Sequence, residues 1–393
     1  MTIGNGKCNV AVLGTSLPRI CGLATFTQDL ITEIAQMKDF NPPRIIAVND
    51  QGRTYAYGKQ VMGQIDHHNR LDYTESAEKL NYSNIDLLVI QHEFGIYGGE
   101  NGEYVLDLVE NLKVPFIVIF HTVLTAPTPK QRHIINRLAY LSLKAITMAQ
   151  NTVDDLTSIY DIALAKIAVI NHGVPFVQTE PREILKQRYG FENRQIISTF
   201  GFLSPGKGIE YGIKAMGQIV KRHPGAHYIV WGQTHPIVKQ RNGEVYRQQL
   251  TALVSKLGLD SNVEFVDRML TQEEVIQSLV LSDIYMTPYL GRDQAVSGTL
   301  AYGIGYGRVI VSTPYRYATE MLADGRGLLA DFRDSNSLAT RILELLEDPR
   351  KKADMEARTL ALGRTMMWSE IAKRYAVLFH ESVRVNHYSG HVV

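Results

Sequence analysis

The strongest constraint on the fold is a pattern that the chain uses twice. Short continuous apolar runs alternate with longer amphipathic stretches, and such runs are typical of parallel strands that helices cover on both faces. The pattern predicts two Rossmann-like α/β halves, each with a doubly wound parallel sheet. The expected strands are 9–13, 44–49, 85–90, 115–120, 145–148 and 167–170, then 195–201, 227–231, 262–266, 284–287, 308–312 and 327–329.

The same pattern predicts where the domains lie. We expect an N-terminal domain over residues 1–178, a C-terminal domain over 195–365, and a connection around 172–193 that contains two prolines. Residues 366–393 form a final segment with a long amphipathic helix, which could cover the second domain or cross back onto the first. Further helices are expected at 25–37, 209–222, 243–257, 272–281, 299–306 and 338–347.

Composition excludes several classes of protein. Lys plus Arg is 41 and Asp plus Glu is 40, so the net charge of +1 argues against nucleic acid as the main partner. Two cysteines, Cys8 and Cys21, are too few for a disulfide scaffold or a multi-cysteine metal site. No leader peptide is recognisable and no apolar run reaches about 18 residues. We therefore expect a soluble cytoplasmic protein, compatible with peripheral membrane contact and of unpredicted oligomeric state.

Polar residues follow three strands of the first half, where ligands of open α/β sheets bind. Gly22 lies at the mouth of the first helix, where a phosphate can approach backbone N–H groups, although a plain turn is the alternative. His92 and Glu93 begin a polar loop with three glycines and are candidates for binding substrate. The alternative is a turn with one capping carboxylate. His121 can donate to a sugar hydroxyl or a phosphate, and a bond to backbone is equally compatible with its position.

The second half carries the stronger signal for an anion. Ser204, Gly206 and Lys207 join a strand to a helix, so free backbone N–H groups and a positive charge lie together. Ser297, Gly298 and Thr299 begin a later helix; a lone Ser there would be a plain cap, but two such loops in one sheet favour phosphate. Together the halves suit transfer of a group away from a phosphate leaving group.

A family resemblance covers nearly the whole chain. The matching segments are 21–26, 91–99, 120–122, 170–175, 201–208, 228–236, 287–289 and 297–313. In this order and spacing they resemble the retaining glycosyltransferases of family 4, also called group 1 glycosyltransferases, and their mannosyltransferase-like branch most of all. The resemblance implies the GT-B fold, in which two Rossmann-like domains face a cleft.

The resemblance also implies roles for single residues. Lys207 matches a lysine at the donor phosphates, His121 a histidine near the donor sugar, and Gly22 a loop near the diphosphate. The family transfers a hexose from an activated donor, here a GDP- or UDP-sugar, to a carbohydrate or glycolipid. It uses neither a catalytic metal nor a further cofactor.

Three positions depart from the family pattern. Gln294 and Tyr302 stand where the family has two glutamates, the second of which holds the ribose, and Phe202 replaces a phosphate-binding arginine. Gln294 can still bond sugar hydroxyls as a neutral amide, so we assign it with His121 and Lys207 to the catalytic residues.

Asp293 is a candidate for guiding a charged substrate, with a solvated loop as the alternative.

Three functions are therefore open, in this order. The first is a retaining hexosyltransferase with a nucleotide-sugar donor, with mannose or glucose favoured. The second is a retaining phosphorylase, or a transferase that uses a sugar 1-phosphate, because the ribose carboxylate is missing. The third is a sugar- or phosphate-binding protein without catalysis, because Phe202 and Tyr302 replace charged residues.

Overall fold

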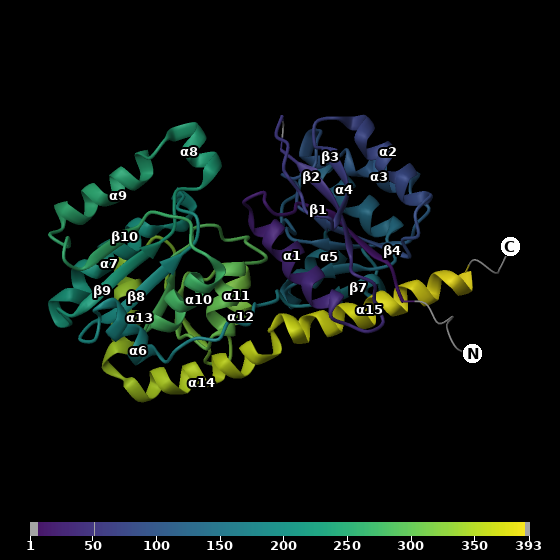
Figure 1. The fold of residues 1–393 in the computed structure, drawn as a ribbon. Coiled ribbons are helices and arrows are strands. Elements are labelled where there is room, and N and C mark those ends of the chain that lie inside the picture. Colours follow the sequence, from purple (N-terminus) through teal and green to yellow (C-terminus); the bar gives the residue numbers. More distant parts are fainter. Residues whose placement is uncertain (1–6, 51, 390–393) are drawn as a thin grey trace. The chain divides into compact units, whose positions relative to one another are not determined.

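The structure is a computed structural model that describes residues 7–50 and 52–389. The chain forms two compact units (Figure 1). Unit 1 holds the residues up to Gly173 together with those from Trp368 onward, and unit 2 is Val174–Met367. None of the described helices is both long and apolar enough to cross a membrane.

Unit 1 contains a seven-stranded parallel sheet in the order β3-β2-β1-β4-β5-β6-β7. Its central strands are continuous buried runs, as in β1 and β5, because helices cover both faces. The strands are β1 (Val10–Gly14), β2 (Arg44–Asn49), β3 (Val61–Asp66), β4 (Leu87–His92), β5 (Phe116–Phe120), β6 (Ala145–Thr147) and β7 (Ile167–Val169). The helices are α1 (Gly22–Ala35), α2 (Arg70–Asn81), α3 (Val105–Asn111), α4 (Pro129–Leu141), α5 (Val153–Ser158) and α15 (Trp368–Ser389).

Unit 2 repeats this design with a six-stranded parallel sheet in the order β10-β9-β8-β11-β12-β13. The strands are β8 (Gln195–Phe200), β9 (Ala226–Trp231), β10 (Val263–Val266), β11 (Ile284–Thr287), β12 (Ile310–Ser312) and β13 (Gly327–Leu329). The helices are α6 (Arg182–Tyr189), α7 (Ile209–Arg222), α8 (Pro236–Asn242), α9 (Val245–Lys256), α10 (Gln272–Leu281), α11 (Gly298–Gly305), α12 (Arg316–Met321), α13 (Ser335–Glu347) and α14 (Pro349–Thr365).

In each sheet the order in which successive strands are added reverses at one point, between β1 and β4 in unit 1 and between β8 and β11 in unit 2. The predicted pair of doubly wound parallel sheets is therefore confirmed. In such sheets the crevice for a ligand opens at the carboxyl ends of the strands beside the reversal. These two edges are where the candidate residues follow their strands.

Some elements differ from the sequence expectation for identifiable reasons. Strand β3 was not predicted, because it is an edge strand in which the exposed Met62 and Gln64 alternate with partly buried residues and no continuous apolar run forms. Helix α14 was not predicted either: Pro349 does not only end the preceding helix but occupies the first turn of the next, which Asp348 caps. The expected connection at 172–193 contains the short helix α6.

Helix α15 packs within unit 1. Its first residue, Trp368, lies edge-on to Phe26 of α1 at 4.9 Å between ring centroids and donates its indole N–H to Asp29 at 3.0 Å. Gly173 lies against the same indole, since a Cβ there would come within 2.2 Å of it. The end of the N-terminal stretch and the start of the last helix therefore share one packing site in unit 1.

Equivalent aspartates anchor the first strand of each sheet at its amino end. Asp86 accepts from the N–H of Asn9, and Asp283 accepts from the N–H of Ile196, each at 2.8 Å. Asp283 is also surrounded by three cations from two helices of unit 2, α6 and α14. Lys186 lies at 2.5 Å, Lys352 at 3.3 Å and Arg182 at 3.7 Å from its carboxylate.

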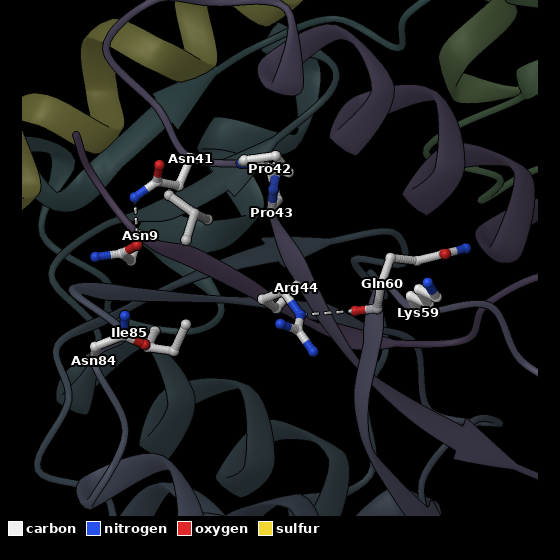
Figure 2. Close-up of a pocket in the computed structure, with 10 residues that line it drawn as sticks. Asn9, Asn41, Pro42, Pro43, Arg44, Lys59, Gln60, Asn84 and Ile85 are labelled. Carbon is white, nitrogen blue, oxygen red and sulfur yellow. Dashed lines mark hydrogen bonds between the residues drawn. The ribbon is translucent and has the colours of Figure 1, made fainter.

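A hollow of about 500 Å³ lies at the amino ends of β1 and β2, as Figure 2 shows. Two of its side chains are held by hydrogen bonds: Asn41 donates to Asn9 at 2.8 Å, and Arg44 donates to the carbonyl of Gln60 at 3.4 Å. The hollow is at the opposite edge of the sheet from the candidate residues. It therefore does not belong to the site that the sequence indicates.

Candidate functional site

The candidate site in unit 2 is built around Lys207. Its ammonium nitrogen lies 3.8 Å from the centre of the Tyr289 ring, an arrangement in which the ring face attracts the cation. A Cβ on Gly201 would lie 3.9 Å from the same nitrogen and 3.3 Å from Thr299, so these groups converge. Within the described residues no carboxylate pairs with Lys207. Its charge therefore remains available to an anion.

The glycine-containing loop after β8, residues 201–208, positions Lys207 next to Tyr289 and Thr299. Gly208 has a φ of +61°, and a Cβ there would meet the carbonyl oxygen of Pro288 at 2.2 Å. The N–H of Leu290 donates to the carbonyl of Gly206 at 2.9 Å. The loop after β8 is thus held against the segment after β11. Gly206 stays exposed, and the half-buried Ser204 begins the short 3₁₀ turn without a side-chain capping bond.

The N-terminus of α11 completes the arrangement. Ser297 caps the helix by accepting from the N–H of Leu300 at 3.2 Å, and its hydroxyl lies 3.1 Å from that of Thr299. The Tyr289 hydroxyl lies 2.8 Å from the same Thr299 oxygen. The first N–H groups of a helix, here from Gly298 onward, have no partner inside the helix. Together with Lys207 they form an environment that favours a phosphate.

The family-departing residues lie close to this helix. Gln294 is half-buried and its amide donates to the carbonyl of Val296 at 3.0 Å. Tyr302 lies in the second turn of α11, with its ring 6.2 Å from that of Phe200 at the end of β8. Asp293 is exposed on the loop before α11.

Two further residues of this site were not assigned a role from the sequence. The face of the Tyr289 ring contacts the Lys207 ammonium, and the ring stacks on that of Tyr315 with 5.6 Å between the centroids. Its segment was recognised as a motif, but only the three-dimensional contact shows what the ring does. His235 lies edge-on to Phe202 at 5.4 Å, and burial and the nearby charge of Lys207 lower its pKa.

The candidate site in unit 1 centres on His121, directly after β5. Its Nε2 lies 2.7 Å from Oε1 of Gln91, and its backbone N–H donates to the carbonyl of His92 at 3.0 Å. Phe26 packs edge-on against the ring at 4.9 Å. Burial, with smaller effects of His172 and His92, lowers the pKa of His121 to about 3. The imidazole is therefore neutral at physiological pH.

His92 and Glu93 lie in different surroundings. His92 is fully buried among Phe94, Tyr97 and Phe120, and burial lowers its pKa to about 3. This ring presents no nitrogen at the surface of unit 1. Glu93 accepts a hydrogen bond from the Thr122 hydroxyl, and burial raises its pKa.

Gly22 is the exposed first residue of α1, after the capping residue Cys21. A Cβ at Gly22 would meet nothing within 4 Å, so the backbone there is open to a ligand. The structure thus brings the predicted residues together in two groups. Gly22, Glu93 and His121 lie at the carboxyl edge of the unit 1 sheet, and the candidates of the second half lie at that of the unit 2 sheet. His92 also ends a strand of unit 1, but its ring is buried in the core. Among residues 7–50 and 52–389, no three His, Cys, Asp or Glu side chains gather as metal ligands.

Residues 194–348 match the family described as "Glycosyl transferases group 1". This is the family that the sequence resembles. The resemblance is therefore confirmed for this part of the chain, which contains the strands, loops and helices that form the Lys207 site.

Two curated relatives of this chain are mannosyltransferases. One is the GDP-mannose-dependent alpha-(1-6)-phosphatidylinositol monomannoside mannosyltransferase of Mycolicibacterium smegmatis, 26% identical over 207 residues, which are 49% of this chain and 51% of the relative. The other, from Corynebacterium glutamicum, acts on the monoacylated form and is 26% identical over 45% of each chain. The chain spans about half the length of the curated relatives it matches.

Solved structures confirm the GT-B fold of this chain. HepE of Anabaena in complex with UDP superposes with a TM-score of 0.74 at 16% identity, covering 95% of this chain and all of that one. A glycosyltransferase of Rickettsia africae gives a TM-score of 0.74 at 15% identity, covering 96% and 99%. At these identities the likeness concerns the fold.

Proposed function

We propose that the protein is a retaining hexosyltransferase that moves mannose or glucose from a nucleoside diphosphate sugar to a carbohydrate or glycolipid. The observation that carries this proposal is the unpaired ammonium of Lys207 beside Thr299 and the N-terminus of α11. A diphosphate leaving group gains negative charge as the glycosidic bond breaks. A fixed cation and oriented N–H groups stabilise that charge more in the transition state than before it.

The remaining roles follow from charge and hydrogen bonding. His121 holds a hydroxyl of the donor sugar, and Gln294 offers a neutral amide to another. With its pKa near 3, His121 is too weak a base to take the acceptor's proton. In our proposal the departing phosphate oxygen takes that proton, while the sugar bonds to the acceptor on the face from which the diphosphate leaves. The reaction proposed here uses no catalytic metal.

Donor and acceptor classes are proposed from the relatives. The two mannosyltransferases use GDP-mannose and a phosphatidylinositol mannoside, whereas HepE was crystallised with UDP and with UDP-glucose. We therefore put a GDP- or UDP-sugar as donor and a glycolipid as the first acceptor class to test. Such an acceptor would place the cytoplasmic protein at a membrane surface.

One observation favours a second candidate, a phosphorylase or a transferase that uses a sugar 1-phosphate. Tyr302 and Phe202 provide neither the carboxylate for a ribose nor the arginine for a phosphate that the family pattern has. Lys207 and the α11 N-terminus would serve a monophosphate equally well. Binding measurements separate the two candidates.

A thermal-shift panel with GDP, UDP, ADP, phosphate and sugar 1-phosphates makes this test. We expect GDP or UDP to raise the melting temperature, because a ligand at a hundred times its Kd adds about 2.7 kcal/mol to the stability of the native state. The K207A variant should lose most of this shift. A response to phosphate or a sugar 1-phosphate alone would overturn the nucleotide-sugar proposal in favour of the second candidate.

A further inference from the structure

Three side chains of unit 1 form a chain of hydrogen bonds that ends at His121. The Thr27 hydroxyl lies 2.9 Å from the carbonyl of Leu23, one turn back in α1. Nε2 of the Gln91 amide lies 3.0 Å from Oγ1 of Thr27, and Oε1 of the same amide lies 2.7 Å from Nε2 of His121. Thr27 and Gln91 have no exposed surface, so water does not compete for these bonds.

The direction of each bond follows from the number of protons available. Thr27 has one hydroxyl proton, which it donates to the carbonyl of Leu23, so its oxygen accepts from Gln91. The amide of Gln91 therefore turns its NH₂ group toward Thr27 and its oxygen toward His121. The opposite orientation would set two acceptor oxygens against each other. An oxygen facing Nε2 of His121 requires that this nitrogen carries the proton.

We propose that Gln91 and Thr27 are positioning residues that hold His121 as its Nε2–H tautomer and leave Nδ1 as a hydrogen-bond acceptor. The inference rests on the proposed function, in which His121 meets the donor sugar, and it narrows what His121 can bind. A neutral ring with a free lone pair accepts from a sugar hydroxyl and repels a phosphate or carboxylate oxygen. His121 thus recognises a hydroxyl group of the sugar rather than the diphosphate.

The surroundings of His121 agree with this assignment. The described residues place no donor on Nδ1, and the ring is only half-buried, so a ligand can reach that nitrogen. Phe26 of α1 packs on the ring, and the titratable neighbours are His92 at the end of β4 and His172 after β7. Both lower the pKa of His121, while the carboxylate of Glu93 is bonded by Thr122. The ring accordingly stays neutral across the physiological range.

Nitrogen-15 NMR of histidine-labelled protein reads the tautomer directly, with the H121Q variant identifying the His121 signals. We expect the wild type to show a protonated Nε2 and an unprotonated Nδ1 that do not change between about pH 6 and pH 9. A His121 that carries its proton on Nδ1, or that titrates near the ordinary pKa of about 6.5, would overturn the proposal.

Variants of the two positioning residues supply the comparison. In Q91E a carboxylate accepts from Nε2–H and favours the charged ring, so the pKa of His121 should rise and Nδ1 should become protonated at low pH. The rate of sugar transfer by Q91E should then decrease as pH falls, whereas the wild-type rate should show no such decrease from titration of His121. Q91L should show a mixture of tautomers and about a tenfold lower kcat, the scale of one hydrogen bond.

Thr27 offers a matched pair that does not depend on the folding of the Gln91 variants. T27S keeps the hydroxyl and should keep the wild-type tautomer, whereas T27V removes it and should let the Gln91 amide turn. An unchanged His121 spectrum in both T27V and Q91L would contradict the proposal. The spectra are independent of sugar transfer: if they are as expected but no donor is turned over, the proposed function fails and the assignment of the positioning residues stands.

Discussion

Replacing Lys207 by alanine should lower kcat for sugar transfer by about 10²–10³-fold, the usual effect of losing one fixed donor at a developing negative charge. The ammonium lies 3.8 Å from the Tyr289 ring and next to Thr299, and within the described residues no carboxylate neutralises it. Without it, the leaving phosphate keeps only the N–H groups of α11. Steady-state kinetics with the donor varied would measure the loss.

Lys214 provides the matched control for this variant. It lies on α7, directly after the Lys207 loop, is exposed, and also approaches a tyrosine ring, that of Tyr211 at 5.4 Å. Because it is outside the candidate site, K214A should keep wild-type kcat. Near-normal turnover by K207A, with correct folding shown by an unchanged melting temperature, would remove Lys207 from the mechanism.

The second large effect concerns stability. Replacing Asp283 by asparagine should lower the free energy of unfolding by about 3 kcal/mol, the lower end of the range for breaking a buried ion pair. The carboxylate is 9% exposed and is contacted by Lys186, Lys352 and Arg182, which come from α6 and α14. Asparagine keeps an acceptor for the N–H of Ile196 but leaves Lys186 and Lys352 without their counter-charge, while Arg182 keeps its pair with Glu356. Urea unfolding of the full chain would measure the difference.

The same cluster predicts how stability depends on pH. Burial opposes ionisation of Asp283, but Lys352, Lys186 and the N–H of Ile196 outweigh it and lower its pKa. A carboxyl group with a lowered folded-state pKa stabilises the protein above the unfolded-state pKa, about 3.9 for Asp. This contribution is lost as pH falls below that value toward the folded-state pKa. The D283N variant should therefore lose less stability than the wild type on acidification in this range.

Asp324 is the control for the stability prediction. It pairs with Arg326 at 3.0 Å in the same unit, but its carboxylate is 82% exposed. Exposed pairs contribute about 0–1 kcal/mol, so D324N should unfold almost as the wild type does. Equal losses in D283N and D324N would show that the buried cluster does not hold α6 and α14 to the sheet.

Much of the fold could be predicted because its signal is local. Strands such as β1 and β5 are continuous apolar runs buried on both faces, and helices such as α7 have a regular apolar stripe. Strand β3 is an edge strand with Gly63 in its middle, so its residues show neither pattern clearly. Helix α14 was missed because a proline is read as the end of a helix, although it also fits the first turn of one.

The candidate site could be predicted only in part. Loops that join a strand to a helix reveal where N–H groups and Lys207 gather, because that arrangement is local in sequence. The direction in which a side chain at a strand end points cannot be predicted from the neighbouring sequence, because it depends on packing with distant segments. Gln91 and His92 are adjacent and point to opposite faces, and only the packing shows that Gln91 reaches His121 while His92 enters the core. The contact between the Tyr289 ring and Lys207 likewise depends on the packing of two separate loops.

The central claim is that a sugar leaves a nucleoside diphosphate and bonds to an acceptor. Its most direct test incubates the protein with GDP-mannose or UDP-glucose labelled with carbon-13 in the sugar, in the presence of a lipid extract, and follows the anomeric carbon by NMR. We predict a labelled product with the same anomeric configuration as the donor and an equal amount of nucleoside diphosphate. Formation of sugar 1-phosphate from an oligosaccharide and phosphate, with neither donor consumed, would contradict the account.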